Sequence, residues 1–331
     1  MPYSYGLDKK DFAIHHDAEA KNFQRVRELN KKGSKTSQHL AIDLTNGKEV
    51  TLNFFNVDQI FQRYLLAFQK NFPPQEAKEK AIQAVNDYVN TQEDIAQRVH
   101  RLQDENIARI YEFRISEDER AKPYLISEYV PGDNFFAATR GFNPLQMIFL
   151  FMPILRALEF MHQNELLHLN LKPSKVRVNA ESRPPVVKLT DFGQAFPLGE
   201  KKPIYSTALY MSPEVICQQY DKIAETSDLY SFAVIAYQAL TEHFPFPERI
   251  EAHDYRQKLI ELVQKEDEPT PLIYYNKDIP QDLNDVILKL LKAKPEDRKF
   301  LQAKPLMLYF FSKWPKESKS MPLDLTTTMV G

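Results

Sequence analysis

Five short stretches occur in a fixed order in the second half of the chain, and they limit what it can fold into. They read ALEFMHQNELLHLNLKPSKVRV (157–178), VVKLTDFGQAF (186–196), STALYMSPEV (206–215), TSDLYSFAVIAYQALTEHFPF (226–246) and AKPEDR (293–298). Any one of them alone is a weak signal, because short motifs also match by chance. Five in one order leave very little room for chance, so we interpret them together.

The order of the predicted secondary structure indicates an α+β fold. Two apolar-rich runs flank Asn46-Gly47, a dipeptide that strongly favours a β-hairpin. A long run rich in helix formers follows, and beyond residue 130 the chain is mainly helical. Strands are expected over 38–56, 107–116 and 123–130, and helix over 57–103. Strands first and helices afterwards predict two segregated parts.

Composition argues against several classes of partner. The chain has 331 residues, of which 43% are hydrophobic and 27% charged, as in ordinary globular proteins. Its formal net charge of −2 gives no bulk attraction to nucleic acid or to an anionic membrane, so neither is expected as a partner. The single cysteine, Cys217, cannot form an internal disulfide, which favours a reducing compartment and a cytoplasmic location. A secreted effector in the cytosol of a host cell stays an alternative.

The most apolar run, LQMIFLFMPILRALEFMH (145–162), is similar in composition to a membrane span. It contains Pro153, Arg156 and Glu159, and its continuous uncharged part is too short to cross a bilayer. We therefore predict a buried, amphipathic core helix for this run, and we expect no membrane partner.

In order, the five stretches resemble the catalytic loop, metal-binding loop, activation-segment end, central helix and final arginine of the eukaryotic-type Ser/Thr protein kinase family. The resemblance is clear over 105–305 and traceable over 25–57. It implies a two-lobed α+β fold, with a small β-sheet N-lobe that holds a helical insertion, a larger helical C-lobe and a cleft between them. The predicted domains are an N-terminal extension (1–24), the N-lobe (25–127, insertion 58–92), the C-lobe (128–313) and a C-terminal tail (314–331).

The resemblance assigns structural roles to residues that match the family pattern. Asp228 corresponds to the buried aspartate of the central helix, which in the family holds the catalytic-loop backbone. Glu214 and Arg298 correspond to the family's buried ion pair in the C-lobe, and removing one partner of such a pair costs about 3–5 kcal/mol. The remaining structural positions are His168, Phe192 and Gly193.

Three positions that carry phosphoryl transfer in the family are substituted here. The lysine that grips the phosphates corresponds to Asn53, which has no positive charge. Asn170 replaces the aspartate that accepts the substrate proton, and an amide is not a useful base near neutral pH. Lys175 replaces the asparagine that holds a second metal ion, and an ammonium repels a divalent cation. Lys172 and Asp191 are retained, and in the family this aspartate binds magnesium.

The nucleotide-pocket positions also depart from the family pattern. The stretch KKGSKT (31–36) stands in place of the glycine-rich loop, and only Gly33 is kept, so backbone N–H groups approach phosphates less closely. The predicted pocket, which we expect to be occluded, is lined by Gln38, Thr51, Ser127, Glu128 and Arg177. Arg177 is long enough to fill the purine space, and we expect it to pair with Asp191 or Glu128.

These substitutions predict a pseudokinase that does not bind ATP and is not an enzyme, and that works as a protein-binding scaffold or allosteric regulator. The expected partner is another protein, either an active kinase or another signalling component; no cofactor and no metal site are expected. Two alternatives stay open. One is a weak or atypical ATP-dependent kinase or transferase that uses Asp191 and Lys172. The other is a sensor of an anionic metabolite bound by Arg177, Lys175 and the basic turn at 31–35.

Two segments are candidates for partner binding. The insertion at 58–92 contains an aromatic-rich run, between Phe61 and Phe72, that either packs against the N-lobe or exposes an apolar docking face. The tail, SKSMPLDLTTTMVG (318–331), either forms a phosphorylatable docking peptide or stays disordered.

Overall fold

The structure is a computed structural model that describes residues 22–29, 36–115, 123–201, 204, 207–246, 260–261, 268–298 and 302–312. The chain divides into two compact units. The β-unit comprises residues 1–103 and 108–129, and the helical unit comprises residues 104–107 and 130–331. The predicted basic turn at 31–35 and the predicted tail at 318–331 both lie outside the described residues.

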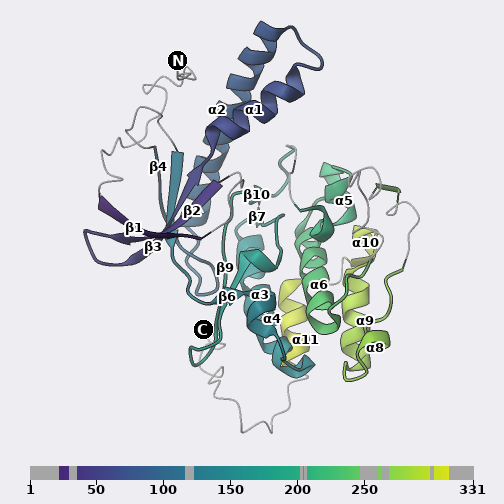
Figure 1. Cartoon of the computed structure of the whole chain (residues 1–331). Helices are drawn as coiled ribbons and strands as arrows, with labels where there is room; N and C mark the ends of the chain where they lie inside the picture. The colour runs from purple at the N-terminus through teal and green to yellow at the C-terminus, as the bar shows by residue number, and fades with distance from the viewer. Residues whose placement is uncertain are drawn as a thin grey trace. The chain divides into compact units, whose positions relative to one another are not determined.

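A five-stranded antiparallel sheet forms the framework of the β-unit, in the order β1-β2-β3-β5-β4 (Figure 1). Its strands are β1 (Phe23–Glu28), β2 (Thr36–Asp43), β3 (Glu49–Phe55), β4 (Ile110–Ile115) and β5 (Pro123–Glu128). The predicted hairpin at Asn46-Gly47 is confirmed as the turn between β2 and β3. Gly47 has a φ of 71° there, a left-handed conformation that glycine adopts without a steric penalty.

Two helices between β3 and β4 form a hairpin (Figure 1). Helix α1 spans Val57–Phe68 and α2 spans Pro74–His100. The side chain of Asn56 caps α1 by accepting the backbone N–H of Gln59 at 3.2 Å. One buried apolar cluster joins the two helices, made of Val57, Ile60, Phe61, Ala81, Val85 and Val89. Most of the aromatic-rich run therefore packs within the hairpin, whereas Leu66 is 63% exposed.

The sheet buries apolar side chains on both of its faces. One face carries a cluster made of Ala41, Val50, Leu52, Phe54, Tyr124 and Ile126. On the other face, Phe55 contacts Tyr88 of α2 with ring centroids 6.2 Å apart, and it contacts Phe113 of β4 at 5.9 Å. Helix α2 thus covers the face of the sheet that carries Phe55, because side chains alternate between faces along a strand.

The helical unit contains short strands among its helices, and four of these strands lie between α4 and α5 along the chain. Its strands are β6 (Asp133–Asn134), β7 (Leu166–Leu167), β8 (Val176–Asn179), β9 (Val186–Leu189) and β10 (Phe196–Pro197). Its helices are α3 (Phe135–Thr139), α4 (Pro144–Gln163), α5 (Pro213–Ile216), α6 (Glu225–Thr241), α8 (Leu272–Tyr275), α9 (Gln281–Leu290), α10 (Pro295–Arg298) and α11 (Ala303–Ser312). Its 3₁₀ turns include η2 (Pro173–Lys175), η3 (Ala208–Tyr210) and η4 (Tyr220–Lys222).

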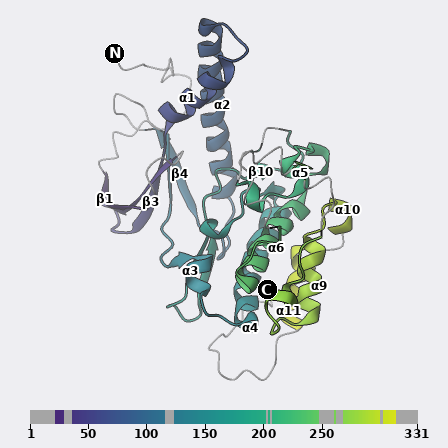
Figure 2. The ribbon, with the colours of Figure 1, turned by 45° about the vertical axis from the view of Figure 1, so that its right-hand side comes forward.

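Helices α4 and α6 form the core of this unit. Helix α4 packs against α6 and α11, and α6 packs against α9 (Figure 2). A capping box between Asn143 and Gln146 begins α4. Among the described helices, α4 alone has the length and hydropathy of a membrane span, but most of it is buried inside the unit, as predicted for a core helix. The predicted fold class, α+β with a small sheet-based part that holds a helical insertion and a larger helical part, is confirmed.

Candidate functional site

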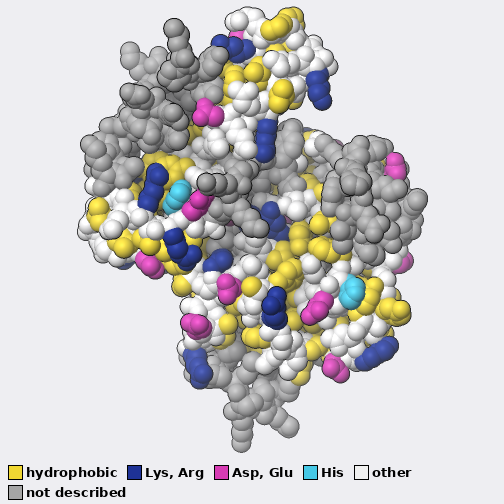
Figure 3. Space-filling view, in the orientation of Figure 1, with side chains coloured by type: hydrophobic (Ala, Val, Ile, Leu, Met, Phe, Trp, Pro, Cys, Tyr) yellow, Lys and Arg dark blue, Asp and Glu magenta, His cyan; other side chains and the backbone are white. Residues whose placement is uncertain are grey.

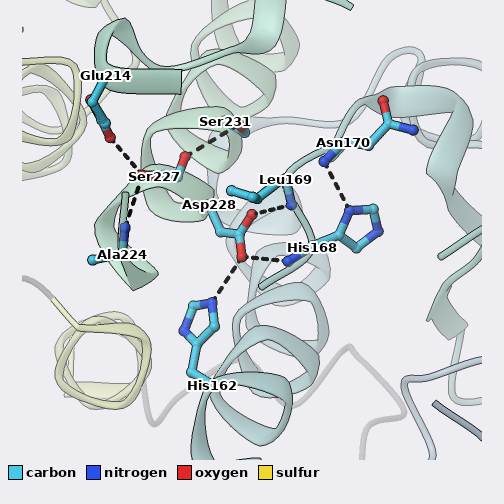
Figure 4. A network of polar contacts seen from close by, with 9 residues as sticks. All are labelled: His162, His168, Leu169, Asn170, Glu214, Ala224, Ser227, Asp228 and Ser231. Carbon is cyan, nitrogen blue, oxygen red and sulfur yellow. Dashed lines mark hydrogen bonds and ion pairs between the residues drawn. The ribbon is translucent and has the colours of Figure 1, made fainter. Parts of the chain in front are cut away.

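A buried carboxylate holds the backbone of the loop that contains the predicted catalytic positions. Asp228, in α6, accepts hydrogen bonds from the backbone N–H groups of His168 and Leu169, each at 2.8 Å. His162, near the end of α4, donates a third from Nε2 at 3.0 Å (Figure 4). Three hydrogen bonds offset the cost of burying this charge. They also fix Leu169 at a φ of 49°, which leucine rarely adopts.

The same contacts set the ionisation of this cluster. Burial opposes the charge on Asp228, but hydrogen bonds from His162 and from the His168 backbone keep the pKa of the carboxyl below its ordinary value. Burial lowers the pKa of the His168 ring, so the ring is neutral at neutral pH. Its Nδ1 accepts the backbone N–H of Asn170 at 3.3 Å, which places the proton on Nε2. That Nε2 has no hydrogen-bond partner within the described part of the chain.

Glu214 and Arg298 form a fully buried ion pair in the helical unit. Arg298 Nη2 donates to Glu214 Oε2 at 2.6 Å, and both side chains are completely buried. The second carboxylate oxygen accepts the hydroxyl of Ser227 at 2.6 Å (Figure 4). The Arg298 guanidinium also lies 5.2 Å from the centroid of the Tyr230 ring. The structure therefore brings together the two residues that the sequence assigned to a structural pair.

Asn170 and Lys172 both lie in the catalytic loop, but their side chains have different surroundings. The Asn170 side chain, at the predicted base position, points away from Asp228 in Figure 4. Lys172 Nζ donates to the Thr207 hydroxyl at 2.7 Å. Lys172 thus connects the catalytic loop to the end of the activation segment, 35 residues further along the chain.

Asp191, the retained aspartate, pairs with Lys175. The Lys175 ammonium contacts Asp191 Oδ2, and the two side chains are 15% and 23% exposed. Burial opposes ionisation of Asp191, but the charge and hydrogen bond of Lys175 keep the pKa of its carboxyl below the ordinary value. Asp191 has a φ of 60°. The sequence singled out both residues but did not predict that they pair.

Arg177 takes a partner other than the two predicted. Its guanidinium donates to the backbone carbonyl of Gly132, while the Asp191 carboxylate goes to Lys175. The register of β6 and β8 pairs Asp133 with Val178, which brings Gly132 close to Arg177. The prediction that Arg177 pairs with Asp191 is therefore wrong, because Lys175 lies next to that carboxylate. Glu128, in the β-unit, accepts the backbone N–H of Arg109 at 3.1 Å.

Four of the predicted pocket and phosphate-site residues share one face of the sheet in the β-unit. Gln38 in β2 lies directly opposite Asn53 in β3, and Thr51 lies opposite Ser127 in β5. Positions directly opposite each other, and positions two residues apart on one strand, have side chains on the same face. The sheet thus carries a polar strip, made of Gln38, Thr51, Asn53 and Ser127.

Asn53, at the position predicted for the phosphate-gripping lysine, is buried. Its Oδ1 has no hydrogen-bond partner among the described residues. Near the predicted glutamate position in α2, Glu93 bonds to Gln97 and Asp94 pairs with Arg98 at 2.8 Å along the helix surface. The buried side of α2 at this level carries Gln92, Ile95 and Ala96. Neither carboxylate therefore lies on the buried side of the helix.

Sequence reasoning missed three contributors to the site. They are His162, the third donor to Asp228; Thr207, the partner of Lys172; and Gly132, whose carbonyl accepts from Arg177. A Cβ at Gly132 would lie 2.2 Å from the carbonyl oxygen of Val178, so the backbones meet too closely there for any other residue. Only the folded register shows these contacts, although His162 lies within the first of the five stretches.

A family model described as the protein kinase domain matches residues 70–306. This match covers more than half of the chain. The chain belongs to the protein kinase family. The matched region contains the Asp228 network, the Glu214–Arg298 pair and the Lys175–Asp191 pair, so the geometry above is that of a kinase C-terminal region.

Named relatives support the family. The chain is 31% identical to an Aurora kinase of Saccharomyces cerevisiae over 188 residues, which cover 55% of this chain and 47% of the yeast protein. It is 34% identical to the serine/threonine-protein kinase ULK3 of Homo sapiens over 186 residues, covering 53% and 36% of the two chains. It is 29% identical to the serine/threonine-protein kinase PknB of Mycobacterium leprae over 217 residues, covering 61% and 32%. The chain spans less than half the length of these relatives.

The prediction that the chain is not an enzyme is contradicted by these comparisons. The matching family model and the similar proteins are those of protein kinases, which are enzymes. The prediction rested on single substituted positions, whereas the comparisons weigh the whole domain. The chain is a member of an enzyme family, the protein kinases.

The magnesium ion that the resemblance implies at Asp191 does not fit the groups present there. Asp191 Oδ2 is held by the Lys175 ammonium, and Lys175 itself stands where an oxygen ligand is expected. Magnesium requires oxygen ligands in octahedral geometry, and a lysine ammonium supplies none. Over the described ranges, no three His, Cys, Asp or Glu side chains are grouped so as to hold a metal.

The buried ion pair predicts a large loss of stability when one partner is removed. We expect Arg298→Met to lower the free energy of unfolding by about 3–5 kcal/mol, because it leaves Glu214 charged and buried. The double variant Glu214→Gln, Arg298→Met recovers part of this loss, since the amide still accepts from Ser227. Urea unfolding followed by circular dichroism measures both.

The exposed pair between Lys201 and Asp221 provides a matched control. Lys201→Met removes one partner of a solvent-exposed pair and is expected to cost about 0–1 kcal/mol. An Arg298→Met variant no less stable than Lys201→Met would contradict the assignment of the buried pair.

Buried neutral His168 predicts a loss of stability in mild acid. Its pKa is lowered on folding, so between its unfolded pKa of about 6.5 and its folded pKa the unfolded chain binds more protons. The free energy of unfolding therefore falls as pH decreases below about 6.5, and His168→Gln makes this slope shallower. Burial also lowers the pKa of His39. His39→Gln is therefore the control, because it removes another histidine with a lowered pKa and leaves the contribution of His168 to the slope in place. An unchanged slope in His168→Gln, measured by urea unfolding at several pH values, would count against the buried neutral ring.

Proposed function

We propose that this chain is a pseudokinase, a protein kinase family member whose phosphoryl-transfer residues are substituted and which acts as a protein-binding scaffold or allosteric regulator in signalling. The contact that carries the proposal is the ion pair between Lys175 and Asp191. The one retained metal-loop carboxylate is engaged by an ammonium, so it is not available to orient nucleotide phosphates through magnesium.

The other substitutions also remove groups that phosphoryl transfer uses. Asn170 supplies no carboxylate base, and general-base help in kinases is worth about 10²–10⁴-fold in rate. Asn53 supplies no positive charge to phosphates. Meanwhile the buried Asp228 and Glu214–Arg298 contacts hold the domain in shape. The residues that stabilise the fold are kept, whereas those that carry phosphoryl transfer are substituted. This combination favours a role in which another protein binds the folded domain.

The α1–α2 hairpin is the surface that we propose for the partner. Its inner side is packed, but Leu66 projects from α1 into solvent. Figure 3 shows hydrophobic, basic and acidic side chains together on the visible face of this hairpin. A mixed apolar and charged surface suits a partner protein with an apolar patch bordered by complementary charges. We propose an active kinase or another signalling protein as that partner.

A second candidate is weak or atypical ATP-dependent phosphoryl transfer that uses Asp191 and Lys172. Two observations favour it. Lys172 is held in place by the Thr207 hydroxyl at 2.7 Å, and the chain is similar to proteins named as serine/threonine kinases. The anionic-metabolite alternative is less favoured, because Lys175 and Arg177 both already have partners.

The proposed function predicts a change in the activity of a captured signalling kinase. We expect the purified full-length chain, cross-linked in cell extract, to capture an active kinase and to change that kinase's rate by about 5-fold or more. Leu66→Asp weakens the capture, because it places a charge in the contact. The matched control is Leu145→Asp, which charges another exposed leucine, on α4.

Phosphoryl transfer by the chain itself is measured in parallel with radiolabelled ATP and magnesium. Transfer that is lost in Asp191→Asn would support the second candidate over the first. Failure of the chain to alter any captured kinase, or equal effects of Leu66→Asp and Leu145→Asp, would contradict the proposed role or its proposed surface, respectively.

A further inference from the structure

The pair between Lys175 and Asp191 is fixed by the backbone around it. Strands β8 and β9 pair antiparallel, with Val176 opposite Leu189. At the end of this ladder, the carbonyl of Lys175 accepts the backbone N–H of Thr190 at 2.8 Å and the Thr190 hydroxyl at 3.3 Å. Lys175 and Asp191 are therefore neighbours because of strand register, and the pair does not depend on a distant contact.

The charges around Asp191 are mainly positive. Lys175 contacts the carboxylate directly, and the charge of Lys172 also lowers the pKa of the Asp191 carboxyl. His168 is neutral, and Lys172 is bonded to the Thr207 hydroxyl. One carboxylate thus faces two ammonium groups. A divalent cation approaching Asp191 meets a local net charge of the same sign, which disfavours binding.

We propose that the Lys175 ammonium is the resident cation of this site, and that it excludes a divalent cation from Asp191 for as long as Lys175 is present. The single charge of lysine takes the place of the metal in neutralising the carboxylate and holding the loop. This inference rests on the degenerate site proposed above, and it does not depend on the partner-binding role.

The site becomes a metal site when Lys175 is replaced by asparagine. The amide oxygen of the introduced asparagine and the carboxylate of Asp191 are oxygen donors of the type that Mg²⁺ and Mn²⁺ prefer. The same strand register places the two positions side by side. One substitution therefore removes the competing cation and adds a ligand, so Lys175→Asn is expected to gain a divalent-cation site that the natural chain lacks.

Titration of the full chain with Mn²⁺ alone, followed by electron paramagnetic resonance, tests this. We expect the natural chain to show no saturable Mn²⁺ site below about 1 mM. Lys175→Asn is expected to gain one site that saturates at Mn²⁺ concentrations about 10-fold or more below that limit, and the double variant Lys175→Asn, Asp191→Asn loses it. The matched control is Lys188→Asn, which makes the same change three residues before Asp191, in β9, and is expected to gain nothing.

Two results of the Mn²⁺ titration would overturn the inference. A saturable Mn²⁺ site in it that Asp191→Asn abolishes would mean that Lys175 does not exclude the metal. A folded Lys175→Asn chain that gains no site would overturn it as well. Should Lys175→Asn fail to fold, Lys175→Met, which removes the charge without adding a ligand, is expected to gain a weaker site. Partner capture is measured separately, so its failure leaves this test unaffected.

Discussion

The carboxylate of Asp228 fixes the catalytic loop from inside the protein, and the positions of the neighbouring residues depend on it. It accepts the backbone N–H groups of His168 and Leu169 and the ring of His162, all within 3.0 Å. A buried charge needs such partners, and the loop in turn needs the charge to keep Leu169 at a positive φ. From this anchor the chain runs through η2 into β8, whose register brings Lys175 to Asp191.

Shape and chemistry thus depend on different residues in this chain. The anchors are buried and paired: Asp228 with the loop backbone, and Glu214 with Arg298 and Ser227. The substituted positions carry groups that suit one another, because Lys175 neutralises the carboxylate that in the family binds a metal. Membership of the kinase family follows from the whole domain, whereas the proposed role follows from how these few side chains are paired.

The sequence was sufficient for the fold class and for the identity of the candidate residues. The hairpin at Asn46-Gly47 and the core helix α4 follow from local patterns, and the positions of Asp228, Glu214 and Arg298 follow from ordered motifs. Pairing between side chains could not be predicted in the same way, because it depends on strand register. Arg177 was expected to pair with Asp191 or Glu128, but the β8–β9 ladder places Lys175 beside Asp191, and Arg177 donates to the Gly132 carbonyl. The prediction that the chain is not an enzyme was also wrong. It rested on single positions, whereas the whole domain matches the protein kinase family.

A crystal structure shows whether Lys175 occupies the place of the metal at Asp191. Crystals of the natural chain grown with Mn²⁺ and a non-hydrolysable ATP analogue allow anomalous scattering to locate manganese without reference to any other signal. The account predicts that Lys175 Nζ contacts Asp191 and that no anomalous peak lies at this carboxylate. An anomalous peak bound to Asp191, with the Lys175 side chain turned away, would contradict it.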